Sequence, residues 1–146
     1  MKNKIYKTIS VICLTGVMLI IFILSQQDTI KSTETSGFVT KLLSMVLGNN
    51  IPEALVRTFG HYSEFAILGL LSINCFFAFR NELKPIISII LSWCYAWTDE
   101  IHQIFVDGRA FQISDLLVDL AGIITGTIVF VLIIKATQSI KKRRKR

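Results

Sequence analysis

The residues most able to do chemistry are concentrated in a small part of a chain that is otherwise strongly apolar. His61 and Glu64 are three residues apart, so they would share one face of a helix. The stretch from 97 to 122, WTDEIHQIFVDGRAFQISDLLVDLAG, adds Asp99, Glu100, Gln103, Arg109, Asp115 and Asp119. A histidine beside a carboxylate suits general acid–base catalysis, and grouped carboxylates suit a divalent cation.

The elements that would position these residues are long apolar segments. The chain has 146 residues, of which 52% are hydrophobic, and its mean hydropathy is +0.58. Residues 8–27 carry no charge, and at about 1.5 Å of rise per residue they would span roughly 30 Å, a bilayer core. We therefore predict an all-α, polytopic membrane protein with a single domain, residues 1–146. Its four transmembrane helices are expected at about 8–27, 58–79, 85–105 and 113–134.

The segment between the first two of these helices contains a shorter amphipathic stretch. Phe38, Leu42, Met45 and Val46 would lie on one side of a helix that ends at GNN, residues 48–50. This pattern is typical of a helix lying at the membrane surface. We predict a short interfacial helix in this first outer loop, followed at Pro52 by the first turn of the second long helix.

The basic residues are distributed unevenly between the two sides. Twelve of the 16 lie on the side of the chain termini, namely Lys2, Lys4, Lys7, Arg80, Lys84, Lys135 and the six in KKRRKR, and the other four are Lys31, Lys41, Arg57 and Arg109. By the positive-inside rule, both termini are expected in the cytoplasm of a bacterium, with the protein in the plasma membrane. The tail, residues 135–146, would contact anionic lipid headgroups, and the net charge of +6 does not suggest nucleic acid.

The carboxylates follow the opposite distribution. Of the ten, only Glu82 is on the cytoplasmic side. Five lie within apolar sequence near the outer ends of the predicted helices: Glu64, Asp99, Glu100, Asp115 and Asp119. One arginine and one or two histidines do not balance five carboxylates, so some of these must be protonated, hydrated or paired with an external cation. This imbalance favours a functional polar pocket over a purely structural network of ion pairs.

Helical spacing adds detail to this pocket. Asp115, Asp119, Gly122 and Gly126 form one stripe, and GIITG is a small-xxx-small pattern that allows close helix packing. We predict Gly122 and Gly126 as helix-packing residues, which turns the two aspartates toward the same neighbouring helix. His61 and Glu64 are the candidate catalytic residues. The candidate ligands of a divalent cation are Asp99, Glu100, Asp115 and Asp119.

The order of these motifs resembles the VanZ-like family of small bacterial membrane proteins. The resemblance rests on SQQ at 25–27, HYSEFAILGLL at 61–71, DEIHQIFVDGR at 99–109 and DLLVDLAGIITG at 115–126. It implies functional roles for His61, Glu64, Asp99, Glu100, Gln103, Arg109, Asp115, Asp119 and Gly122. Small departures occur at Gln26 and Asp107. The resemblance also implies low-level resistance to teicoplanin with little protection against vancomycin, a phenotype for which the family supplies no agreed reaction.

Three functions are compatible with these features. The first is recognition of a lipid-linked cell-envelope component, such as a cell-wall precursor, or of a lipoglycopeptide, with membrane lipids as constant neighbours. Aromatic contacts would come from Phe65, Trp93, Trp97, Phe105 and Phe111. The alternative is a metal- or carboxylate-dependent membrane enzyme that modifies a lipid headgroup. An ion or proton carrier is disfavoured, because the predicted helices 85–105 and 113–134 offer only Ser88, Ser92, Thr125 and Thr127 below the carboxylates.

Overall fold

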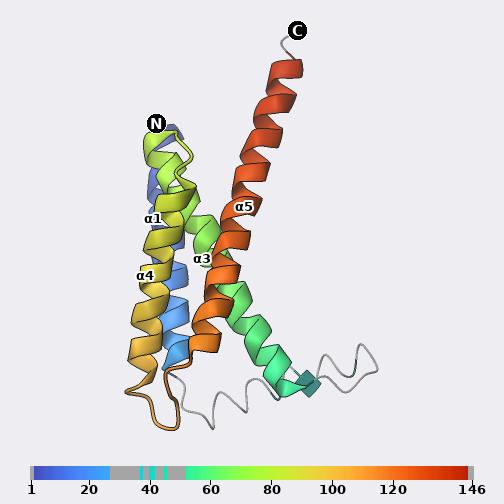
Figure 1. Ribbon diagram of the computed structural model, residues 1–146. Helices are drawn as coiled ribbons and strands as arrows, with labels where there is room; N and C mark the ends of the chain where they lie inside the picture. The colour runs from blue at the N-terminus through green and yellow to red at the C-terminus, as the bar shows by residue number, and fades with distance from the viewer. Residues whose placement is uncertain (1, 27–36, 38–39, 42–44, 46–51, 145–146) are drawn as a thin grey trace.

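Four helices make up the ordered framework. The computed structural model describes residues 2–26, 37, 40–41, 45 and 52–144. The helices are α1 (Lys2–Ser25), α3 (Glu53–Arg80), α4 (Pro85–Gln103) and α5 (Ile113–Arg143), and this part of the chain contains no strand. Successive helices run in alternating directions, so the start of α1, the α3–α4 turn and the end of α5 lie at one end of the molecule (Figure 1). The α4–α5 loop lies at the other end.

Three of the four helices, α1, α3 and α5, are long and apolar enough to cross a membrane. The prediction of an all-α chain with several membrane-compatible helices is therefore confirmed. The helix α4 has 19 residues and is not among these three, because its last turns contain Asp99, Glu100 and His102. Most of the segment predicted as an interfacial helix lies outside the described residues.

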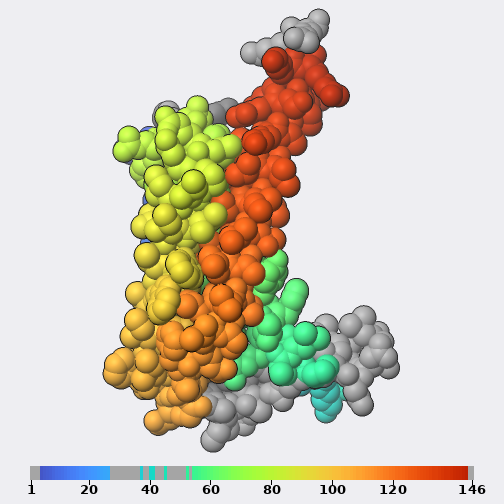
Figure 2. All heavy atoms as spheres, in the orientation of Figure 1, coloured from blue at the N-terminus to red at the C-terminus, as the bar shows by residue number. Residues whose placement is uncertain are grey.

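The helix boundaries differ from the predicted ones mainly at three places. The helix α1 begins at Lys2, and not at 8. The helix α3 begins at Glu53, directly after Pro52, and not at 58. The helix α5 continues past 134 to Arg143, so most of the predicted basic tail is helical. No proline or glycine follows Gly126 to end the helix, and cationic side chains are favourable near a helix C-terminus. Figure 2 shows these last turns of α5 extending beyond the other helices.

Short-range interactions set the turn between α3 and α4. Asn81 adopts a left-handed conformation with φ of 55°, and its N–H donates to the carbonyl of Phe77 over 2.8 Å. This arrangement closes the C-terminus of α3 in the usual way. Pro85 then occupies the first turn of α4, where a missing N–H costs nothing.

The helices α3 and α5 cross at very close range, and glycines make this possible. A Cβ atom on Gly122 would collide with the carbonyl oxygen of Tyr62, and one on Gly126 with that of Ala66. Gly69 of α3 faces the backbone of Ile123 in the same manner. These two helices form the largest interhelical contact in the described part of the chain (Figure 1).

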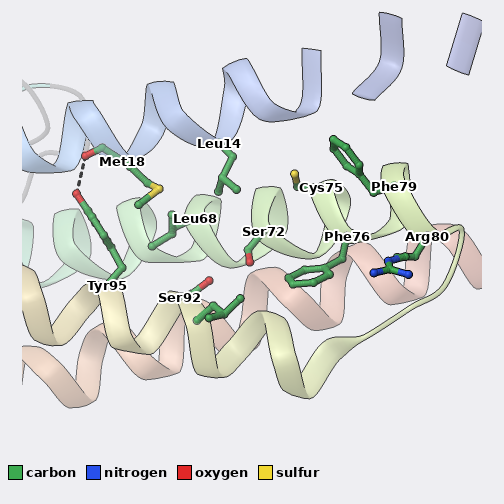
Figure 3. A pocket seen from close by; sticks show the side chains of 11 residues that line it. Leu14, Met18, Leu68, Ser72, Cys75, Phe76, Phe79, Arg80, Ser92 and Tyr95 are labelled. Atoms are coloured by element: carbon green, nitrogen blue, oxygen red, sulfur yellow. Dashed lines mark hydrogen bonds between the residues drawn. The ribbon is translucent and has the colours of Figure 1, made fainter. Parts of the chain in front are cut away.

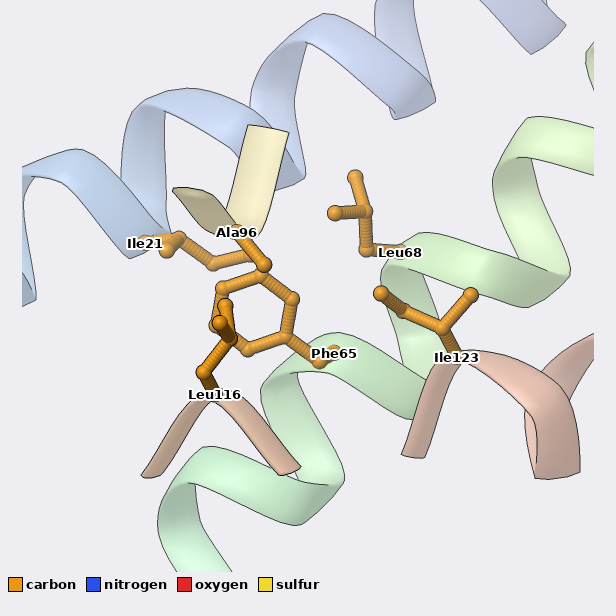
Figure 4. Packing of buried hydrophobic residues seen from close by; sticks show 6 residues of the cluster. All are labelled: Ile21, Phe65, Leu68, Ala96, Leu116 and Ile123. Atoms are coloured by element: carbon orange, nitrogen blue, oxygen red, sulfur yellow. The ribbon is translucent and has the colours of Figure 1, made fainter. Parts of the chain in front are cut away.

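An apolar core lies where all four helices meet. Phe65 of α3 is fully buried and packs with Ile21 of α1, Ala96 of α4, and Leu116 and Ile123 of α5 (Figure 4). The ring of Phe65 thus occupies the centre of the bundle directly beside Glu64 in the sequence. This places apolar packing between the charged region and the half of the bundle that contains the termini.

Candidate functional site

Polar side chains from all four helices converge at the end of the bundle opposite the termini. They come from the last turn of α1, the first third of α3, the last turns of α4 and the first turns of α5, together with the α4–α5 loop. We call the following residues the polar cluster: Ser25, His61, Glu64, Asp99, Glu100, Gln103, Arg109, Asp115 and Asp119. The predicted site residues therefore lie at one end of the molecule. They come from distant parts of the sequence, and the packing of the helices brings them together.

Five members of the cluster are almost completely enclosed. The exposed fraction is 5% for Ser25 and Asp99, 0% for Glu100 and Asp119, and 1% for Gln103. Three of these are carboxylic acids, and burying a carboxylate without a partner is costly in any apolar environment. A structure that keeps them here has either a chemical use for them or a strong set of partners.

On α4, the spacing of four residues places Gln103 against Asp99. The side-chain amide of Gln103 donates to Oδ2 of Asp99 over 3.1 Å. The buried Ser25 hydroxyl at the end of α1 adjoins the same carboxyl group. The sequence indicated Ser25 only as part of SQQ, so its position beside Asp99 is a finding of the structure.

Glu100 is held by the backbone of the following loop. The N–H of Gln112, the residue just before α5, donates to Oε2 of Glu100 over 2.9 Å. This bond connects the end of α4 to the start of α5. Sequence analysis did not identify Gln112, because a backbone donor leaves no signature in the residue type.

His61 of α3 lies closest to Asp119 of α5, and not to its sequence neighbour Glu64. Nδ1 of His61 is 3.6 Å from Oδ1 of Asp119, which is beyond hydrogen-bond length but within the range of an ion pair. The exposed fractions of the two side chains are 13% and 0%. The contact joins the two helices beside the glycines at their crossing, on the side of the α4–α5 loop.

Two further members of the polar cluster, Glu64 and Asp115, interact electrostatically with the residues described above. Glu64 is half-buried and interacts electrostatically with His61, Asp99 and Asp119. Asp115 is half-buried at the start of α5 and contributes to the field at His61. The cluster is thus one interacting set rather than several separate pairs.

Arg109 is placed in the α4–α5 loop by a turn. Gly108 has φ of 74°, a conformation that glycine adopts without strain, and the N–H of Arg109 donates to the carbonyl of Val106 over 3.1 Å. Burial lowers the pKa of the Arg109 guanidinium, and the charge of Arg57 acts in the same direction. The carboxylates that oppose this shift are Asp99, Glu100 and Asp115. Since the pKa of arginine is far above neutrality, Arg109 remains the fixed positive charge of the cluster.

Several buried oxygens of the cluster have no hydrogen-bond donor within the described residues. They are both carboxyl oxygens of Asp119, Oδ1 of Asp99 and Oε1 of Glu100. Buried carboxyl oxygens normally accept one or more hydrogen bonds, so these four acceptors are an unusual concentration. They can be satisfied by a proton on the acid itself, by water, or by donors from a bound molecule.

The described residues include no group of three or more His, Cys, Asp or Glu side chains arranged to hold a metal ion. The predicted candidate ligands Asp99, Glu100, Asp115 and Asp119 share the cluster, but in this arrangement they do not form such a group. We therefore assign no step of the proposed function to a cation.

The predicted aromatic contacts separate into two groups. Phe65 is fully buried in the core, so its expected role as a contact near the membrane interface is wrong. Trp97 and Phe105 are 40% and 79% exposed, and the ring of Phe111 lies 5.8 Å from that of Trp97. Phe105 and Phe111 belong to the loop that carries Arg109, and Trp97 at the end of α4 contacts this loop through Phe111.

Comparison with known proteins identifies the family of the chain. A family model described as VanZ/LLP1 matches residues 10–134, which include every member of the polar cluster. No curated protein matches the chain, and no solved structure does.

Proposed function

Because the chain belongs to the VanZ/LLP1 family, we propose that it is an integral membrane protein whose polar cluster recognises the headgroup of a lipid-linked cell-envelope component or a lipoglycopeptide. Through this recognition it contributes to resistance of the teicoplanin type. The plasma membrane of a bacterium is its proposed location, and the polar cluster faces outward.

The proposed topology has four membrane crossings. The 19 residues of α4 would extend roughly 28 Å at 1.5 Å per residue, close to the thickness of a bilayer core. Its charged residues are confined to its last turns, where a crossing helix reaches the membrane surface. Twelve of 16 basic residues lie on the side of the termini, so both termini are placed in the cytoplasm. From its amphipathic sequence, the stretch of the first outer loop that ends at GNN, residues 48–50, is proposed as a short interfacial helix.

The observation that carries this proposal is the set of buried acceptors without donors on Asp99, Glu100 and Asp119. Such oxygens would bind a ligand that presents hydroxyl, amide or ammonium groups, because each of these donates a hydrogen bond. Hydrogen bonds to charged acceptors are also stronger than neutral ones. Sugar–peptide headgroups and glycopeptides are rich in these donors.

The exposed aromatic residues support a ligand that is partly apolar. Trp97 and Phe105 border the loop after α4, beside the polar cluster. At a membrane–water interface, amphipathic rings suit contact with both a headgroup and a hydrocarbon chain. A lipid-linked ligand combines both kinds of surface.

A second candidate function is an enzyme that modifies a lipid headgroup. The contact between His61 and Asp119 favours it, because a carboxylate can orient a histidine that acts as a general base. Glu64 is also a candidate base, since it is half-buried in the same field. An enzyme would convert its ligand, whereas a recognition protein would release it unchanged.

The test of the proposal is antibiotic susceptibility in a sensitive Gram-positive host. Teicoplanin and vancomycin are compared for cells expressing the wild type, Glu64→Gln, Asp119→Asn and the control Asp107→Asn. Asp107 is an exposed carboxylate in the loop outside the cluster, so its change removes the same charge without touching the site.

We expect selective protection against teicoplanin that is lost in Glu64→Gln and Asp119→Asn but kept in Asp107→Asn, at equal amounts of membrane protein. Equal protection by all four would exclude the polar cluster from the function. A wild type that is present in the membrane and gives no protection would contradict the resistance role itself.

A further inference from the structure

A second site lies in the half of the bundle that contains the termini. A cavity of about 350 Å³ is enclosed by α1, α3 and α4. Figure 3 shows Leu14 and Met18 of α1 pointing toward Leu68 of α3 across it. Its volume is at the lower end of the range for ligand pockets, which suits a narrow molecule.

The wall of this cavity is suited to hydrocarbon. The hydroxyl of Tyr95 closes one end by donating to the carbonyl of Met18 over 2.6 Å (Figure 3). The hydroxyl of Ser72 donates to the backbone carbonyl of Ser88 over 3.5 Å. These two donors already have partners, and the remaining lining is aliphatic or aromatic apart from Cys75, Arg80 and Ser92, whose buried hydroxyl has no hydrogen-bond partner among the described residues. A polar solute would find few groups to bind here.

The cavity is also accessible from outside the bundle. Two lining residues are about half exposed, Phe79 with a fraction of 51% and Leu91 with 52%. In a membrane this surface borders lipid chains, so a chain can enter from the side without crossing water.

Positive charge is concentrated where the cavity reaches the end of α3. Arg80, the last residue of that helix, is exposed and lines the cavity. The ammonium of Lys7 lies 5.3 Å from the centre of the Phe79 ring, so a second cation adjoins the same wall. Nearby, Glu82 is already paired with Lys84 over 2.9 Å. An anionic group at this end would therefore meet Arg80 and Lys7.

We propose that this cavity is a binding site for one acyl chain of an anionic phospholipid, whose phosphate contacts Arg80 and Lys7. The acyl chain fills the space between α1, α3 and α4. The headgroup lies at the level where α3 ends, on the side of the twelve basic residues. The site is separate from the polar cluster and is filled from the opposite leaflet.

Cys75 provides a direct probe, because it lines the cavity while Cys94 of α4 is exposed elsewhere. Two full-length proteins are purified in detergent, each retaining only one of these cysteines. The rate of alkylation by N-ethylmaleimide is then measured as phosphatidylglycerol or phosphatidylcholine is added to the micelles. We expect phosphatidylglycerol to slow the reaction of Cys75, phosphatidylcholine to act only at higher concentration, and Cys94 to be unaffected.

The charge requirement is tested with Arg80→Gln and Lys7→Gln, and Lys84→Gln serves as the control because its charge is already paired. Each of the first two changes should raise about fivefold the phosphatidylglycerol concentration that halves the alkylation rate of Cys75. This is the effect expected from the loss of one contact between a cation and an anionic lipid. Equal protection by the two lipids would overturn the proposal, as would slowing of Cys94 in parallel with Cys75. Unprotected Cys75 in a protein with an unchanged melting temperature would overturn it as well.

Discussion

Nδ1 of His61 and Oδ1 of Asp119 face each other over 3.6 Å at the crossing of α3 and α5. The pair lies one helical turn from Gly122, toward the start of α5, and the missing side chain of this glycine lets the two helices approach. Close packing and charge are thus coupled, because the glycines bring the histidine and the aspartate into range. The distance is slightly longer than a hydrogen bond, so a small movement of either side chain would complete the contact.

The first prediction concerns that crossing. Replacing Gly126 by leucine should reduce the yield of folded protein strongly, because its Cβ alone would collide with the carbonyl of Ala66. Overpacking of a tight interface costs about 1–3 kcal/mol or more. The matched control is Gly16→Leu on α1, where an added Cβ meets no atom within 4 Å. Size-exclusion chromatography in detergent measures the yield, and equal yields for both variants would contradict the close crossing.

The second prediction concerns the link between α4 and α5. Glu100→Ala should lower the free energy of unfolding by about 1–3 kcal/mol, because the N–H of Gln112 would lose its buried acceptor. Gln112→Ala should leave stability nearly unchanged, since its backbone N–H remains. Unfolding by denaturant in micelles compares the two. A larger effect from Gln112→Ala would mean that its side chain, and not its backbone, holds the loop.

The third prediction concerns orientation in the membrane. In a variant without native cysteines, Asp107→Cys should react with a membrane-impermeant maleimide added to intact cells. Lys142→Cys should react only after the cells are permeabilised. Both positions are exposed and lie at opposite ends of the bundle. The reverse pattern would invert the topology and place the polar cluster in the cytoplasm.

Much of the framework could be predicted from sequence because apolar runs have a simple signature. The uncharged run at 8–27 and the apolar run at 113–134 correspond to α1 and α5, with errors only at their ends. The helix ends were harder, since nothing in the residues after 134 distinguishes a solvated helix from an irregular tail.

Only part of the candidate site could be predicted from the sequence. Spacing along one helix placed Gln103 and Asp99 on the same face, where the structure has a hydrogen bond. Contacts between helices had no such signature, which is why the bond from Gln112 to Glu100 and the pairing of His61 with Asp119 are findings of the structure. The cavity beside Arg80 needs three helices to form, so no single segment indicated it.

The most direct test of the central claim is the melting temperature of Asp119→Asn in detergent, compared with that of the wild type. If the polar cluster exists for binding, removing a buried negative charge that has no hydrogen-bond donor should leave the melting temperature unchanged or raise it. If the cluster is a structural ion-pair network, breaking a buried pair should cost about 3–5 kcal/mol and lower the melting temperature by roughly 5 °C or more. A fall of that size would contradict the account.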